Sequence, residues 1–90
     1  MENIILKNNF LSIQNKKELL YYYNAPIINI KYLVSFKYFN VSNIEEHPYI
    51  VFEMIDKRKE KWFFKEYEIM CSIFEEMEKI ILNNKEPKIF

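Results

Sequence analysis

The 90-residue chain contains no glycine. Glycine is the residue that most readily takes a positive φ angle, so turns that need this geometry must be built from other residues. Asparagine tolerates the left-handed region better than most residues, and the chain places asparagines between its hydrophobic runs. We therefore predict turns at these asparagines, which are Asn8, Asn9, Asn24, Asn40, Asn43, Asn83 and Asn84.

The composition also limits the class of protein. Glycine-rich phosphate loops of the Walker and dinucleotide types are excluded, because both need glycine where the backbone approaches phosphate. Half of the residues are hydrophobic, and 13 basic side chains balance 13 acidic ones, which lies outside the composition of disordered segments. The length predicts a single domain spanning residues 1–90.

The chain carries no recognisable export or membrane signal. Met1 is followed by an apolar run without a basic region, and no apolar stretch approaches the roughly 20 residues that cross a bilayer. Cys71 is the single cysteine and cannot form an intrachain disulfide, which fits a reducing compartment. We expect a cytoplasmic protein that does not contact the membrane.

The clearest periodic segment runs from Glu66 to Asn83. Its apolar residues recur at the spacing of an amphipathic helix, and its opposite face is acidic. Asn83 and Asn84, with Pro87 beyond them, provide a stop signal. We predict a long helix over about 66–83 and a short tail over 84–90. The apolar positions of this helix are Met70, Ile73, Phe74, Met77, Ile80 and Ile81.

Strand patterns precede the helix. Residues 49–55 and 61–65 are rich in β-branched and aromatic residues and flank the polar segment 56–60, which predicts a hairpin. Residues 28–39 alternate either as one long strand or as two strands broken near Lys31. In the first arm of the hairpin, one face carries Ile50, Phe52 and Met54; the second arm puts Trp62 and Phe64 together; and in residues 28–39, one face carries Ile28, Ile30, Tyr32, Val34, Phe36 and Tyr38.

Residues 15–23 are ambiguous. Asn15 to Glu18 has the shape of a capping box, which would start a brief helix through Tyr23. The tyrosine run instead favours a strand over 19–23, and Pro26 favours extended geometry just before it. We prefer the strand.

Together these segments predict an α+β fold. Residues 3–7 and 10–13 form a further candidate hairpin across Asn8 and Asn9, so the strands all lie within 3–65. The expected architecture is an antiparallel β-sheet of about four to five strands packed against one long C-terminal amphipathic helix.

Three segments give the chain a recognisable order: residues 26–30 leading into a strand, the hairpin turn at 56–60, and Trp62-Phe63-Phe64 running directly into the helix. This order resembles small phage and mobile-element proteins in which a β-meander precedes a C-terminal helix. They include some pleckstrin-like modules and phage inhibitors of bacterial defence, of the anti-CRISPR type. The resemblance implies a host defence protein, such as a CRISPR effector, as partner. It assigns no site residue.

No set of residues predicts catalysis or a bound metal. His47 and Cys71 have no sequence neighbours that would orient them as a nucleophile and its base, and structural zinc needs four such ligands. Acidic residues near His47 are better explained by solubility and turn formation than by an oxygen-ligand site. We expect no enzyme activity, no metal and no cofactor. The acidic residues concerned are Glu45, Glu46, Glu53 and Asp56.

A basic hairpin next to many aromatic residues suggests single-stranded nucleic-acid binding, by attraction of phosphates and stacking of bases. The zero net charge and the single arginine argue against it, because nucleic-acid modules usually carry a basic excess. We keep it as the alternative function. Its candidate residues are Lys57, Arg58, Lys59 and Lys61.

Our leading interpretation is a small non-catalytic protein-binding module, with a homodimer as a further option. The aromatic residues exceed what one helix-covered sheet face needs, so some should lie on the second face and form an interface. The alternative is a two-sided core in which the N-terminal strands fold over into a small barrel. The acidic helix face is the other candidate surface. The candidate partner-binding residues are Glu68, Glu75, Glu76, Glu78, Tyr21, Tyr23 and Phe63.

Overall fold

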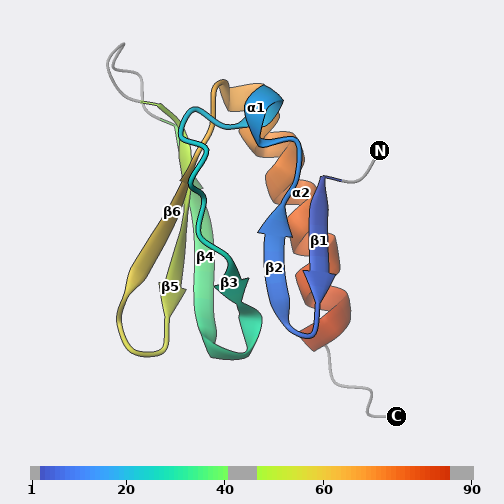
Figure 1. Ribbon diagram of the computed structural model, residues 1–90. Helices are drawn as coiled ribbons and strands as arrows, with labels where there is room; N and C mark the ends of the chain where they lie inside the picture. The colour runs from blue at the N-terminus through green and yellow to red at the C-terminus, as the bar shows by residue number, and fades with distance from the viewer. Residues whose placement is uncertain (1–2, 41–46, 86–90) are drawn as a thin grey trace.

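Two three-stranded antiparallel sheets and one long helix form the fold in the computed structural model, which describes residues 3–40 and 47–85 (Figure 1). The α+β class is confirmed, but the strands form two sheets, ordered β1-β2-β3 and β4-β5-β6, where we expected one. The elements are β1 (Ile4–Lys7), β2 (Phe10–Ile13), α1 (Lys16–Leu19), β3 (Ile28–Asn29), the 3₁₀ turn η1 (Ile30–Tyr32), β4 (Leu33–Phe39), β5 (Tyr49–Met54), β6 (Lys59–Phe63) and α2 (Tyr67–Lys85).

The turns show how a chain without glycine reverses direction. Asn8 and Asn9 join β1 to β2 with φ angles of 52° and 71°, as a two-residue type I′ turn requires, which confirms the prediction for this pair. Asn15 and Lys57 also have positive φ, at 54° and 73°. We did not predict this at Lys57, which takes the position in the β5–β6 turn that glycine would usually occupy.

Four of the other asparagines do not form the predicted positive-φ turns. Asn24 and Asn40 are not among the described residues with positive φ. Asn83 and Asn84 lie inside α2, which continues to Lys85. An asparagine in a helix costs under about 0.7 kcal/mol relative to alanine, so two of them do not end a helix of this length. Asn43 lies outside the described residues.

The preferred strand over residues 19–23 is wrong. Residues 16–19 form the short helix α1, and Leu20 then makes a single antiparallel bridge to Phe64. Leu20 is fully buried, whereas the three tyrosines that follow are each about half exposed, so only one residue of this segment gains by pairing with the sheet. The backbone N–H of Tyr21 donates to the Phe63 carbonyl (2.9 Å), which places this segment along the edge of β6.

The start of α1 also differs from the capping-box prediction. Asn15 has the left-handed conformation, and its side chain makes no capping hydrogen bond to the helix. Its carbonyl accepts the N–H groups of Glu18 and Leu19, each at 3.1 Å, and its side-chain amide donates to the Asn3 side chain (2.7 Å). Backbone hydrogen bonds to the Asn15 carbonyl therefore start the helix. The Asn15 side chain instead links α1 to Asn3, the residue before β1.

Residues 28–39 follow the second alternative, two strands broken near Lys31. The turn η1 separates β3 from β4, and the Asn29 side chain accepts the Lys31 N–H (3.0 Å). A bulge between Leu33 and Ser35 then shifts the alternation. As a result Leu33 is buried and Val34 is 60% exposed, so Val34 does not share the environment of Ile28 and Ile30, which we placed on the same face.

The core lies between the two sheets and α2. It is one hydrophobic cluster, in which Phe52 and Trp62 from the second sheet are fully buried. The Trp62 indole N–H donates to the Pro26 carbonyl (2.7 Å), which satisfies the one polar group that this large side chain brings into the core. The buried residues of α2 in this cluster are Met70, Ile73, Met77 and Ile81, all at predicted positions.

Candidate functional site

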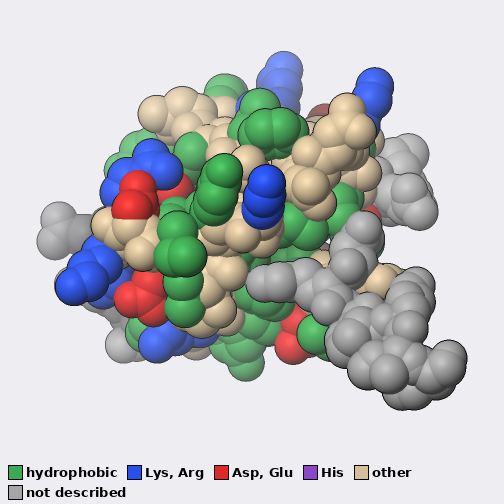
Figure 2. Space-filling view, turned by 90° about the horizontal axis from the view of Figure 1, so that it is seen from below, with side chains coloured by type: hydrophobic (Ala, Val, Ile, Leu, Met, Phe, Trp, Pro, Cys, Tyr) green, Lys and Arg blue, Asp and Glu red, His purple; other side chains and the backbone are tan. Residues whose placement is uncertain are grey.

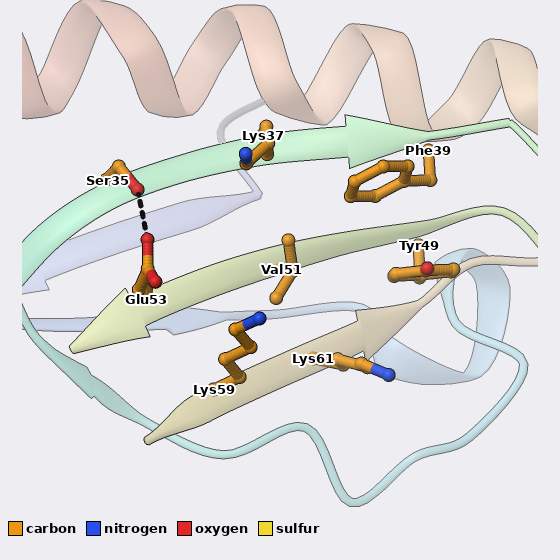
Figure 3. Close-up of a pocket in the computed structure, with 8 residues that line it drawn as sticks. All are labelled: Ser35, Lys37, Phe39, Tyr49, Val51, Glu53, Lys59 and Lys61. Carbon is orange, nitrogen blue, oxygen red and sulfur yellow. Dashed lines mark hydrogen bonds between the residues drawn. The ribbon is translucent and has the colours of Figure 1, made fainter. Parts of the chain in front are cut away.

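The face of β4-β5-β6 directed away from the core forms a grid of side chains, which we call the outer face (Figure 3). Strand register places its residues in three rows, each crossing all three strands. The aromatic row is Phe39, Tyr49 and Phe63; the lysine row is Lys37, Val51 and Lys61; and the polar row is Ser35, Glu53 and Lys59.

The aromatic row is a set of rings in contact across the strands. The Tyr49 ring lies between those of Phe39 and Phe63, with centroid distances of 5.2 and 5.3 Å. Tyr22 meets Phe63 edge to face at 5.2 Å, so the row continues into the segment beside β6. Phe39 is 41% exposed and Tyr22 52%, so both rings keep surface open to solvent.

Beyond Tyr22, the series of rings continues to His47. Tyr21 packs edge to face on Tyr22 at a centroid distance of 4.8 Å, and it also stacks on the His47 ring at 3.5 Å. The Tyr21 and Tyr22 rings can meet because residues 21–23 do not form the strand that we preferred, in which neighbouring side chains would point to opposite faces. These contacts extend the aromatic surface from the sheet to the residue just before Pro48.

The lysine row holds two cations on either side of an apolar residue. Lys37 and Lys61 pair with Val51 from its two sides, which sets their backbones about 10 Å apart at the usual strand spacing. Val51 is only 7% exposed, so neighbouring side chains shield it. The Lys61 ammonium lies 5.1 Å from the Tyr49 ring centroid, within range of a cation–π interaction.

The polar row carries the single carboxylate of the grid. The Ser35 hydroxyl donates to Glu53 Oε1 at 3.2 Å, drawn as a dashed line in Figure 3. Glu53 is half-buried, and Lys59 on β6 is its neighbour in the strand register. The hollow lined by the outer face has a volume of about 190 Å³, below the roughly 300 Å³ of typical small-molecule sites, so the face is an open platform.

The structure divides the predicted basic hairpin between two places. Lys59 and Lys61 belong to the outer face, whereas Arg58 lies at the turn, where its Nε donates to Asp56 (2.7 Å) and its Nη1 lies 3.7 Å from Glu60. The backbone N–H of Arg58 also donates to Asp56, and this bond is the main cause of a lowered pKa for that carboxyl. Basic and acidic side chains accordingly alternate at one side of Figure 2, beside hydrophobic ones. Lys57, with its positive φ, forms the turn itself.

The predicted acidic surface on α2 also divides. Glu76 accepts the backbone N–H groups of Asn3 and Ile4 with one carboxylate oxygen, at 2.9 and 3.0 Å, and so fixes the start of β1 against the helix. Glu75 and Glu78 are exposed beside Cys71 and Phe74, and Glu68 lies near Leu19 on another side of the helix. Glu76 therefore has a structural role.

The potential reactive residues have separate environments. His47 stacks on Tyr21, while Cys71 lies on α2 near Tyr38 and Phe74. A hydrogen bond with the Cys71 thiol, together with the charges of Cys71 and Tyr38, raises the pKa of Tyr67 to about 12. Within residues 3–40 and 47–85, no group of three or more histidine, cysteine or acidic side chains could hold a metal ion. Glu45 and Glu46 lie outside these ranges.

Comparison of the chain with protein-family models, with curated proteins and with solved structures finds no match. In the part of the chain that the structure describes, no helix has the length and apolar character needed to span a membrane.

Sequence reasoning found part of the outer face and missed the rest. Phe63, Lys59 and Lys61 of this face were candidates, as was Tyr21 beside it, but for two different functions. The other members went unassigned, although the period-two alternation groups them on one side within each strand. The missed residues are Ser35, Lys37, Phe39, Tyr49, Val51 and Glu53.

Proposed function

We propose that the protein is a non-catalytic module that binds single-stranded nucleic acid on the outer face of β4-β5-β6. The observation that carries this proposal is the lysine row lying directly beside the aromatic row on an open sheet face. Proteins that bind single strands without strong sequence preference combine cations that follow the phosphates with rings on which bases stack. The exposed rings of Phe39 and Tyr22 would provide the stacking surfaces.

The charge distribution supports this proposal despite the zero net charge. The outer face carries three lysines and one glutamate, whereas the exposed glutamates of α2 lie on the helix that packs against the inner side of the same sheet. The outer face thus carries a local excess of positive charge. A local basic patch is sufficient to attract phosphate, because at physiological ionic strength a charge acts over only about 8 Å.

The structure weakens one half of the protein-binding interpretation. An acidic helix surface was to meet a basic target, but Glu76 is already committed to the backbone of Asn3 and Ile4. The tyrosines keep the other half open. Tyr21, Tyr22 and Tyr23 are about half exposed, Tyr22 contacts Phe63 of the outer face, and exposed tyrosines are common in protein interfaces. A host protein partner, of the defence type that the resemblance implied, is therefore our second candidate.

The lysine row gives the first test. We would measure binding of a labelled single-stranded oligonucleotide of about ten nucleotides by fluorescence anisotropy over a range of salt concentrations. If Lys37 and Lys61 of the lysine row and Lys59 of the polar row all contact phosphates, the logarithm of the binding constant should fall against log salt with a slope of about −2. The double variant Lys37→Gln/Lys61→Gln should reduce that slope by about 1.4. The control Lys7→Gln/Lys79→Gln removes the same charge from β1 and α2 and should leave the slope unchanged.

The aromatic row gives the second test. Phe39→Leu keeps an apolar side chain but removes the ring, and loss of one stacked base should weaken binding at least about fivefold. Tyr32→Leu is the matched control, because Tyr32 has a similar exposure (47%) but lies in η1. Absence of binding to any oligonucleotide, or equal losses in the outer-face and control variants, would contradict the proposal.

The two candidate functions are separated by capture from a nuclease-treated lysate. A single stoichiometric partner that resists nuclease, and that is lost in Tyr21→Ser/Tyr22→Ser, would favour the protein-binding function. Light scattering of the isolated protein in the same buffer would identify a homodimer. If the protein binds nucleic acid, the proteins captured from an untreated lysate should be lost when the lysate is treated with nuclease.

A further inference from the structure

Glu53 carries a negative charge on a face that is otherwise basic. The other charged residues of the outer face are lysines, and a carboxylate among them reduces attraction for phosphate. A cross-strand ion pair with Lys59 would be the simple structural explanation. Among the described residues, however, ion pairs within 4.0 Å involve only Arg58, and the hydrogen bond of the Glu53 side chain is the one from Ser35.

Glu53 is a hydrogen-bond acceptor on the outer face, the face to which we assign the nucleic-acid strand. The Ser35 hydroxyl holds Oε1, and the half-buried position on the central strand restricts the side chain, while Oε2 has no protein donor among the described residues. Val51 belongs to the lysine row and lies two residues from Glu53 along β5, so the Glu53 backbone is about 7 Å from that row, where a phosphate would be held. A base next to that phosphate can reach it.

A carboxylate discriminates between bases by what it can accept. Cytosine offers an exocyclic amino group, and pairing of glutamate with this group is a common recognition contact. Uracil carries a carbonyl oxygen at the same position, and carbonyl oxygens lie on both sides of its N3–H, so they repel an approaching carboxylate. The contact is charge-assisted, which makes it stronger than a bond between neutral groups.

We propose that Glu53 sets a base preference on the outer face, favouring bases with an exocyclic amino donor over uracil and thymine. The inference rests on the proposed function and deepens it, because Glu53 acts only if a strand lies on this face. Ser35 is then a positioning residue that fixes the acceptor.

The test compares labelled single-stranded deoxyoligonucleotides of cytosine and uracil, each about ten nucleotides long. They differ in the donor and acceptor groups at ring positions 3 and 4, and not in ring size. Native protein should bind the cytosine strand about five- to tenfold more tightly, at the low end of the discrimination by one base contact. Glu53→Gln can both accept and donate, so it should bring the two affinities within about twofold and raise uracil binding. Ser35→Ala should reduce the preference in part.

The outcomes separate the two levels of the proposal. Equal affinities in the native protein, or a preference that persists in Glu53→Gln, would overturn the role of Glu53 while leaving the platform intact. Absence of binding to either strand would overturn the proposed function and this inference with it. Glu75→Gln removes one carboxylate from an exposed site on α2 and should leave the base preference unchanged, and circular dichroism checks that every variant is folded.

Discussion

The two faces of the β4-β5-β6 sheet use similar residues for different purposes. On the inner face, Ile50, Phe52 and Trp62 are fully buried and pack in one cluster with α2. On the outer face, Phe39, Tyr49 and Phe63 contact one another but remain partly open to solvent. The comparison shows that aromatic content does not identify the core of this protein. What separates core from surface is the side of the strand on which a ring lies.

The companions of the rings differ as well. The inner rings are accompanied by aliphatic side chains and methionines, whereas the outer rings lie beside lysines. A lysine keeps its ammonium group in water, so an aromatic ring beside it is not fully covered. The exposed surface of the ring stays available to a ligand. The inner face therefore supplies stability, and we assign binding to the outer one.

The largest expected effect sharpens this comparison with two adjacent residues. Trp62→Ala should destabilise the protein by about 3–5 kcal/mol, because it empties a fully buried volume and removes the hydrogen bond to Pro26. Phe63→Ala should cost well under half as much, since Phe63 lies on the partly open face. Urea denaturation followed by circular dichroism measures both free energies of unfolding.

Trp62→Phe keeps most of the buried ring but removes the donor to the Pro26 carbonyl. Its cost should lie between the two alanine variants, at about 1–3 kcal/mol, if the carbonyl is left unsatisfied. Equal destabilisation by Trp62→Ala and Phe63→Ala would mean that the outer face is covered in solution, and the comparison would fail.

The next effect applies the same comparison to α2, where adjacent glutamates have different roles. Glu76→Ala should destabilise the protein by about 2 kcal/mol, because two backbone N–H groups at the start of β1 lose a charged acceptor. Glu75→Ala should change the free energy of unfolding by less than about 0.5 kcal/mol, as expected for an exposed helix residue. Hydrogen exchange at Ile4 should increase in the first variant and not in the second.

Much of the fold was predictable because the sequence alternates clearly wherever one side of an element is buried. The α2 stripe and the residues of the β5–β6 hairpin that face the core follow directly from period 3.6 and period 2. The tyrosine run misled us, because tyrosine favours strands only where a partner strand is available, and here one bridge at Leu20 is all that forms. The shift at Val34 comes from a bulge that no local residue type announces.

The outer face was only partly predictable for a related reason. Its nine residues come from three strands, and which of them share a row depends on strand register. Register between β4 and β5 is set by tertiary pairing across the intervening segment, which sequence spacing does not reveal. The dual role of the helix glutamates likewise required knowing that β1 begins beside Glu76.

A smaller effect concerns the turn that holds β5 and β6 in register. Lys57 has a φ of 73°, a conformation that costs a residue with a Cβ roughly 1–2 kcal/mol relative to glycine. Lys57→Gly removes this conformational cost, but the unfolded chain with glycine has a larger entropy, which offsets part of the stabilisation. The variant should therefore stabilise the protein by about 0.5–1 kcal/mol. Lys59→Gly, two residues further in β6, should destabilise it. A loss of stability in Lys57→Gly would show that the turn differs in solution.

The smallest effect is visible only at high pH, at the side of α2 next to the inner face of β4. Tyr67 and Tyr38 meet at a ring-centroid distance of 6.4 Å, and the pKa of Tyr67 is raised to about 12, mainly by its hydrogen bond with Cys71. A phenol whose pKa is higher in the folded state contributes stability that is complete below pH 10 and is lost as pH rises from about 10 to 12. Absorbance titration of phenolate should show one late component, which Tyr67→Phe removes.

Two variants of Cys71 separate the causes of the raised pKa of Tyr67. Cys71→Ala removes both the hydrogen bond and the thiolate charge, so the late component should move toward the normal tyrosine range. Cys71→Ser keeps a hydroxyl partner without an ionisable thiol, so an intermediate position would assign the larger share to the hydrogen bond. A late component that is unchanged in both variants would mean that Cys71 is not the cause, and that Tyr67 is controlled instead by its packing against the inner face of β4.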